Sequence, residues 1–436
     1  MITIKKYIQI TAAVSLFWML SSFITANAQI NMNELKQLRG EIKRLTFSGN
    51  NIAHYPCLSS NGRWMLYTIE IKDGEEPPKA IRIMNLENGK ETELFRDGKR
   101  KALAPYENAF LYIGSKPPVL SGNGQVAVFS LSVGEPFHIL DHYLAVIKND
   151  GSDFWLINFP IDALAERDLR SFEFTGKDWE RLSNYAVSGD GSRIACALKG
   201  HLGPRRYGNP SGIVLIDAKS RQKRTTLAPE FNGKEWEWSS FPRRPLTGGG
   251  WAFCMSGNGQ KIVFGAQSSS EKIDYDLYVT DWEDLEIKKI TDFHDRWFSL
   301  ADISYDGKKI VFFYNGSKKQ GIGTYSINSD GTGLEFQESR VAARVELFDL
   351  SGNGQFILFK HIYTGMILDL HTGQEAVAFD EKTPGYLKGL IPMDFPRIPA
   401  FWAPKIMSHD GNRILLVGPP QGKQTPEIYM LRIDMK

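Results

Sequence analysis

The stretch LSGNGQVAVF, Leu120–Phe129, decides the fold of this chain, because its pattern occurs seven times. An apolar residue ends one strand, a serine able to bond backbone amides follows, and Asn-Gly or Asp-Gly then supplies the conformation that a tight hairpin needs. One or two polar residues lead into a β-branched or aromatic run, which is typical of the next strand. The other copies are Leu58–Tyr67, Val187–Cys196, Met255–Phe264, Ile303–Phe312, Leu350–Phe359 and Met407–Leu416. Seven hairpins of one design predict a repeat protein.

A second motif follows each hairpin, an alternating strand that often ends in Asp or Asn and a glycine turn. Its copies are Ile81–Gly89, Tyr143–Gly151, Gly212–Ala218, Asp276–Asp281, Gly323–Gly331, Gly365–Gly373 and Glu427–Asp434. A fourth strand comes next and is clearest at Ile287–Phe293. Four strands in each of seven units predict an all-β fold, a seven-bladed β-propeller of four-stranded antiparallel blades.

The last unit stops after its third strand, so its fourth strand must come from elsewhere in the chain. Glu41–Ser48 resembles the fourth strand of the other units in its pattern. We expect this N-terminal strand to pair onto the last blade and close the ring, which protects sheet edges from aggregation. The propeller is therefore expected to span residues 41–436, with a linker over 29–40.

The first 28 residues read as a signal peptide. Lys5 and Lys6 form a positive start, Ile8–Ile24 carries no charge, and Ala26–Ala28 is a small-residue cleavage site. An uncleaved N-terminal anchor is the alternative, since the apolar stretch is nearly long enough to span a bilayer. Cleavage predicts a periplasmic or secreted protein without a transmembrane segment.

Charge and cysteine usage narrow the class of partner. Removing the signal peptide leaves 50 basic residues against 50 acidic ones, so nothing favours nucleic-acid binding. We expect a monomer whose ligand is a protein or a glycan held at one face of the propeller. Cys57, Cys196 and Cys254 are expected to be buried free thiols, with a Cys196–Cys254 bond as the minor alternative.

The Ser-x-Asp-Gly hairpin and its following strands resemble the TolB-type propeller repeat over essentially residues 41–436. Such repeats occur in TolB, in the propellers of prolyl oligopeptidase-like peptidases and in oligogalacturonate lyases, so the resemblance implies the fold more strongly than a function. The chain departs from TolB in having no room for an α/β domain before the propeller, and from the peptidases in lacking a Gly-x-Ser-x-Gly nucleophile. The lyases are similar in having seven blades, and that resemblance implies a metal held by several histidines in the channel.

Catalytic motifs are absent from the sequence. It has no His-Glu-x-x-His, no Cys-x-x-Cys and no phosphate-binding glycine loop, so we expect neither a metal nor a cofactor. Its eight histidines match no ligand cluster, and His371 and His409 lie in expected surface turns. Asn149–Asp153 and Asn328–Gly331 faintly resemble calcium loops, but turn chemistry explains them.

Candidate ligand-binding residues lie where the chain enters each innermost strand, because those loops line one mouth of a propeller channel. Most of them stand eight to ten residues before the repeat glycine. The set is His54, Lys116, Arg181, Trp251, Trp297, Asp302, Arg344, Glu346, Asp349 and Trp402. Aromatic rings beside basic groups suit a sugar or a peptide, although these tryptophans could instead pack between blades. Lys234–Pro245 and Phe395–Pro404 are aromatic-rich insertions that could extend such an interface.

These features favour an exported, non-enzymatic propeller that binds a protein or a carbohydrate in the cell envelope. A polysaccharide-active enzyme resembling the oligogalacturonate lyases, with its site at the channel mouth, is the first alternative. A scaffold subunit of an envelope complex, in the manner of TolB, is the second.

Overall fold

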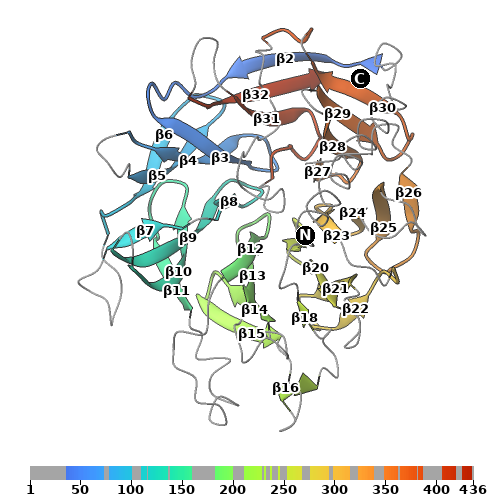
Figure 1. Ribbon diagram of the computed structural model, residues 1–436, viewed down its shortest axis with the longest axis horizontal. Helices are drawn as coiled ribbons and strands as arrows, with labels where there is room; N and C mark the ends of the chain where they lie inside the picture. The colour runs from blue at the N-terminus through green and yellow to red at the C-terminus, as the bar shows by residue number, and fades with distance from the viewer. Residues whose placement is uncertain are drawn as a thin grey trace, which may run out of the picture.

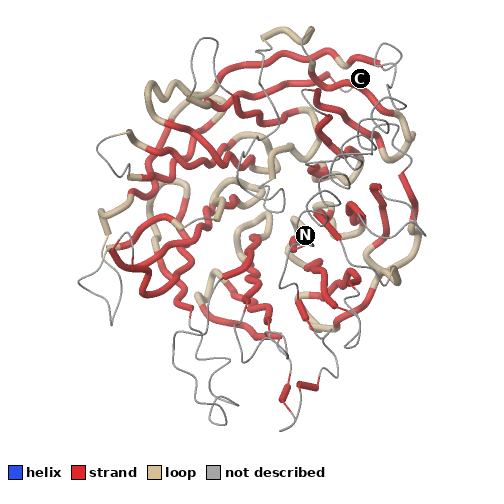
Figure 2. The backbone as a smooth tube through the Cα atoms, in the orientation of Figure 1, coloured by secondary structure: helices blue, strands red, loops and turns tan. Residues whose placement is uncertain are grey.

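The computed structural model describes residues 36–72, 78–100, 110–114, 116–135, 138–159, 182–199, 211–227, 230–231, 236–237, 244–245, 253–267, 275–293, 298–314, 323–337, 348–361, 364–380, 382–385, 405–418 and 425–434. Sheets are arranged around a central axis, with the chain passing from one sheet to the next (Figure 1). The described residues form strands, turns and irregular segments only (Figure 2), and none of them belongs to a helix that could cross a membrane. The signal peptide predicted over 1–28 lies outside these residues.

Seven antiparallel sheets form the blades, as predicted. Blade 1 contains β3 (Ile52–Leu58), β4 (Trp64–Glu70), β5 (Lys79–Asn85) and β6 (Glu91–Arg96). Blade 2 contains β7 (Leu111–Ile113), β8 (Val119–Leu120), β9 (Val126–Glu135), β10 (His138–Lys148) and β11 (Trp155–Phe159). Blade 3 contains β12 (Leu182–Val187), β13 (Arg193–Lys199), β14 (Ser211–Asp217) and β15 (Gln222–Leu227). Blades 4 and 5 contain β18 (Arg244–Pro245), β19 (Phe253–Met255), β20 (Lys261–Gln267), β21 (Tyr275–Asp281) and β22 (Ile287–Lys289), then β23 (Phe298–Ile303), β24 (Lys309–Tyr314), β25 (Gly323–Asn328) and β26 (Glu335–Gln337). Blades 6 and 7 contain β27 (Phe348–Leu350), β28 (Phe356–His361), β29 (Thr364–Asp369) and β30 (Glu375–Phe379), then β31 (Arg413–Gly418) and β32 (Glu427–Asp434). A separate hairpin consists of β16 (Glu230–Phe231), just before the aromatic-rich insertion Lys234–Pro245, and β17 (Trp236–Glu237), within that insertion.

The hairpin turns have the chemistry that the repeat predicts. In all seven copies the serine hydroxyl accepts the N–H five residues later and donates to the Asn or Asp two residues later. The repeat glycine has a φ between 66° at Gly62 and 77° at Gly191, a region that costs other residues energy. Hydrogen bonds within a few residues of each other therefore define the geometry of each turn.

An N-terminal strand closes the ring, which confirms the prediction. Strand β2 (Arg39–Arg44) runs antiparallel to β32, from Arg39 opposite Asp434 to Arg44 opposite Tyr429. The pairing starts before Glu41, and it is preceded by β1 (Lys36–Gln37), which pairs in parallel with β30 of blade 6. The segment expected to be a linker over 29–40 thus includes residues that bond to two neighbouring blades.

A buried carboxylate fastens this closing strand to blade 7. Glu427 is fully buried and accepts hydrogen bonds from Thr46 Oγ1 at 2.5 Å, Arg44 Nη2 at 2.8 Å and the backbone N–H of Ser48 at 3.0 Å. A buried charge is tolerated only when it is paired and hydrogen-bonded, as this one is. Glu427 therefore joins the two ends of the ring through side-chain contacts as well as backbone pairing.

Apolar side chains fill the space between neighbouring blades. Leu66 of blade 1 and Phe129 of blade 2 belong to one buried cluster, and Val263 of blade 4 packs with Phe312 of blade 5 in another. Each such side chain contributes roughly 1.5–3 kcal/mol when fully buried. The three cysteines are unbonded, with Cys57 and Cys196 buried and Cys254 half-buried, so the expectation of free thiols is confirmed and no Cys196–Cys254 bond forms.

Candidate functional site

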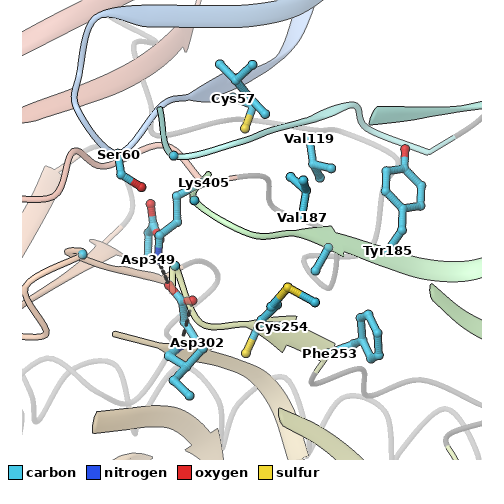
Figure 3. A pocket seen from close by; sticks show the side chains of 18 of the residues that line it. Cys57, Ser60, Val119, Tyr185, Val187, Phe253, Cys254, Asp302, Asp349 and Lys405 are labelled. Atoms are coloured by element: carbon cyan, nitrogen blue, oxygen red, sulfur yellow. Dashed lines mark hydrogen bonds and ion pairs between the residues drawn. The ribbon is translucent and has the colours of Figure 1, made fainter. Parts of the chain in front are cut away.

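A cavity of about 180 Å³ occupies the central channel, and residues from all seven blades line it. Representative residues, in blade order, are Cys57, Lys116, Asn184, Cys254, Asp302, Asp349 and Lys405. Figure 3 shows Val119, Tyr185, Val187 and Phe253 on one side of the cavity and the charged groups on another. The cavity therefore combines an apolar wall with a charged one.

Seven hydrogen bonds join the repeat turns into a closed ring around the channel. Each connects a backbone N–H of one turn to a carbonyl of the turn in the next blade, and the last returns to blade 1. The pairs are Asn61 to Gly122, Asn123 to Gly189, Gly189 to Gly257, Asn258 to Tyr305, Tyr305 to Gly352, Asn353 to His409 and His409 to Ser60. We call this ring of turns the floor, because six of its residues also line the cavity.

Only two of the residues between Ser and Asn/Asp in these turns carry rings, Tyr305 and His409. Their rings meet edge to face, with centroids 5.6 Å apart. The Tyr305 ring lies over Gly189 and Gly257, where a Cβ on either glycine would overlap ring atoms. Glycine is needed at these two positions because an aromatic ring occupies the space of a side chain, so Tyr305 narrows this end of the channel.

Gly257→Ala tests that packing. We expect the free energy of unfolding to fall by about 2–3 kcal/mol, because overpacking forces a ring or the backbone to move. Urea unfolding measures the loss, and Tyr305→Ala in the same chain should restore most of it. Equal losses in the single and double variants would show that Tyr305 is not the obstacle.

The charged wall is a cluster of three side chains from three blades. Lys405 of blade 7 donates to Asp302 of blade 5 at 2.5 Å and to the carbonyl of Leu350 at 2.8 Å, and its Nζ lies 3.3 Å from Asp349 of blade 6. Asp349 Oδ2 also accepts the backbone N–H groups of Ile406 and Met407, each at 2.7 Å. The cluster therefore holds blades 5, 6 and 7 together at the channel (Figure 3).

Burial and mutual attraction shift the titration of this cluster. Burial raises the pKa of Asp349 to about 7, which Lys405 opposes and the nearby Asp302 reinforces. Burial alone would lower the pKa of Lys405, but the charges of Asp302 and Asp349 hold that pKa above its ordinary value. Lys405 thus stays cationic, while Asp349 changes charge near neutral pH.

The two cysteines on the cavity wall are poor nucleophiles. Burial raises the pKa of the Cys57 thiol to about 12 and raises that of Cys254 well above its ordinary value. Because the thiolate is the reactive form, these thiols remain neutral at physiological pH. They act as small apolar wall groups.

His54 does not line the cavity. It lies in β3, where burial and then the charge of Lys79 lower its pKa to about 4, and its Nε2 is 3.7 Å from Glu70. Its ring stacks on Tyr55, which has a φ of 54° beside an irregularity in the β3–β4 register. His54 is therefore a neutral, packed side chain.

Three of the ten residues selected from the sequence meet at the cavity: Lys116, Asp302 and Asp349. Six others lie outside the described residues, namely Arg181, Trp251, Trp297, Arg344, Glu346 and Trp402, as does the insertion Phe395–Pro404.

Sequence reasoning missed Lys405, Cys57 and Cys254 as cavity residues. A position five residues before the repeat glycine lines the cavity in six blades, at Cys57, Val119, Ala186, Cys254, Asp302 and Asp349. Lys405 stands one residue earlier in blade 7. The repeat therefore indicated these residues, but the prediction considered mainly the positions eight to ten residues before the repeat glycine.

The metal that resemblance to the lyases implies does not fit the described cavity. No histidine is among its lining residues, and the described part of the chain contains no group of three or more His, Cys, Asp or Glu that could hold a metal ion. His371 and His409 are exposed in turns, as expected.

Comparison with known proteins supports the fold. No protein-family model matches the sequence, and no curated protein matches it. An oligogalacturonate lyase from Vibrio parahaemolyticus is similar with a TM-score of 0.56 and 9% identity, over 92% of this chain and 98% of the lyase. The β-propeller domain of the trilobed protease from Pyrococcus furiosus is similar with a TM-score of 0.53 and 12% identity, over 88% of this chain and 96% of the domain. TolB from Acinetobacter baumannii has a TM-score of 0.39 and 12% identity, over 74% of this chain and 62% of TolB.

The fold and the cavity together define a seven-bladed β-propeller with a charged central cavity. At the level of fold it resembles the oligogalacturonate lyase and the propeller domain of the trilobed protease. Because the sequence identities are this low, these similarities show the fold alone.

Proposed function

We propose that this protein is an exported, non-enzymatic propeller that binds part of a protein or carbohydrate ligand in its central cavity. The observation that carries the proposal is the cavity itself, in which an apolar wall faces a charged wall. Ligand sites combine mostly apolar lining with a few placed polar groups in this way. Export is supported by the sequence of residues 1–28 alone.

The charged wall suits binding better than covalent chemistry. Lys405 has three N–H donors and three acceptors within reach, Asp302, Asp349 and the Leu350 carbonyl. A lysine that stays protonated has no lone pair for attack, and the neutral thiols of Cys57 and Cys254 are weak nucleophiles. The cluster therefore shapes and charges the cavity without offering an activated nucleophile.

Filling the cavity tests the binding role. Asn184→Trp places a large ring at the cavity wall and should reduce ligand capture at least tenfold, the equivalent of about 1.4 kcal/mol. The mature chain and the variant are compared on a glycan array and in pull-downs from envelope extract. Asn50→Trp, in an exposed turn, is the matched control. Partners captured equally by all three chains would show that the cavity is not the binding site.

A polysaccharide-active enzyme is the second candidate, and Asp349 favours it. A carboxyl group whose pKa is raised to about 7 can take up or release a proton at physiological pH, as a general acid or base must. Two backbone N–H groups donate to its Oδ2, so Oδ1, which lies 3.3 Å from Lys405 Nζ, is the oxygen that would exchange the proton. Incubation with oligogalacturonate, followed by ultraviolet detection of the unsaturated product, separates a lyase from a binding protein.

A further inference from the structure

Four backbone N–H groups at the floor have no hydrogen-bond partner within the described part of the chain. They belong to Ser60, Gly122, Gly257 and Gly352, the residues between Ser and Asn in the turns of blades 1, 2, 4 and 6. The corresponding N–H groups of Gly189, Tyr305 and His409 bond to the next turn instead. All four unpaired donors come from residues that line the cavity.

Unpaired amides at one end of a cavity are costly unless a ligand or water accepts from them. Proline is favoured at this second position of a tight turn and would remove the N–H, yet none of the seven copies has it. Asn184 adds a side-chain donor, because its Oδ1 accepts the N–H of Tyr185 and its Nδ2 bonds to no residue in the described part of the chain. These donors belong to residues that line the cavity, where a ligand or water can accept from them.

The wall beside the floor limits what can carry that acceptor. Val119, Val187 and Phe253 line the same cavity and offer carbon surface rather than hydrogen-bonding groups (Figure 3). A sugar ring carries hydroxyls around its edge that such a wall leaves unpaired, at a cost in binding free energy. A carboxylate joined to an apolar group satisfies both the donors and the wall.

We propose that the floor binds a carboxylate whose adjoining group is apolar, as at the C-terminal end of a peptide with an apolar last residue. The proposal rests on the proposed binding role and specifies the chemistry of its ligand. Backbone amides that converge in turns are an established way to hold anionic oxygens.

The charges of the cavity are compatible with an anion. Lys116 and Lys405 contribute two positive charges, Asp302 and Asp349 at most two negative ones, and the thiols of Cys57 and Cys254 stay neutral. Asp349 takes up a proton below about pH 7, so the cavity becomes more positive as the pH falls. Carboxylate binding should therefore be tighter at about pH 6 than at about pH 8.

The test uses N-acetylleucine as the carboxylate probe and N-acetylleucinamide as its neutral match. Labelling with [carbonyl-¹³C]serine and [¹⁵N]glycine selects only Ser–Gly amides by NMR, and the chain has six of them. Three are floor donors, Gly122, Gly257 and Gly352. The remaining three are internal controls, namely Gly189 (whose N–H is bonded), Gly49 and Gly212.

We expect N-acetylleucine to shift the three floor signals and the amide to leave them in place. Ser60→Pro removes one donor while keeping a turn-compatible residue, and should weaken the carboxylate about tenfold. Ser60→Ala keeps the N–H and removes only the hydroxyl, so it should weaken binding much less than Ser60→Pro does. Asn184→Ala removes a side-chain donor outside the turns and should also weaken binding. It provides the test if Ser60→Pro fails to fold.

Equal shifts with both probes, or none with either, would overturn the proposal, as would floor shifts with glucuronate alone. In each of these cases a ligand captured on the array or in the pull-down, and lost with Asn184→Trp, would still support the binding role. If neither the floor shifts nor a capture that depends on the cavity is observed, the proposed function is overturned as well.

Discussion

Replacing Lys405 with methionine should lower the free energy of unfolding by about 3 kcal/mol at about pH 8. The change leaves Asp302 and Asp349 facing each other near the channel without their shared cation. Removing one partner of a largely buried pair is costly because the remaining charges stay poorly solvated. Urea unfolding of the parent and the variant measures the difference. Lys308→Met is the control, since its ion pair with Asp306 is exposed and should cost under about 1 kcal/mol.

The pH dependence of this loss identifies its cause. The pKa of Asp349 is raised to about 7 in the folded protein, above its ordinary unfolded value, so the protonated carboxyl stabilises the fold at low pH. That stabilisation is complete below about pH 4 and disappears as the pH rises through about 7. Without Lys405 the pKa of Asp349 should rise further, so the variant should lose much less stability at about pH 5 than at about pH 8. A loss independent of pH would point to lost packing of the lysine stem instead.

Glu427→Ala should be as damaging, with an expected loss of about 3–4 kcal/mol in the free energy of unfolding. The change leaves Arg44, Thr46 Oγ1 and the Ser48 N–H without their common acceptor where β2 closes the ring. Hydrogen exchange should also show β2 and β32 opening more often than the strands of the other blades, because Glu427 holds the closing strand at this point.

Two further variants separate the charge of Glu427 from its hydrogen bonds. Glu427→Gln keeps an acceptor for Thr46 and Ser48 but loses the ion pair with Arg44, so its loss should be intermediate. Glu87→Ala breaks an exposed pair with Arg63 and should change stability by under about 1 kcal/mol. A Glu427→Ala protein as stable as the parent would mean that backbone pairing alone closes the ring.

The fold could be predicted from the sequence because its decisive interactions are local. In every turn the serine bonds to groups two and five residues away, and the glycine needs its positive φ within the same stretch. Closure was predictable as well, since blade 7 lacked a strand and Glu41–Ser48 matched the missing pattern. The parallel pairing of Lys36–Gln37 with blade 6 carried no such signal, because two residues are too few to show a period.

The residues that line the cavity could be predicted only in part, for the opposite reason. Lys405 bonds to Asp302, 103 residues earlier, and to Leu350, 55 residues earlier. Which side chains converge on the channel depends on how each blade is tilted and how far its inner strand reaches, and those follow from packing between blades. The sequence by itself determined the repeat, the turns and the closing strand, because neighbours along the chain decide them. Only the tertiary structure decided that Lys405, Asp302 and Asp349 meet beside the floor of turns, because that meeting requires the completed ring.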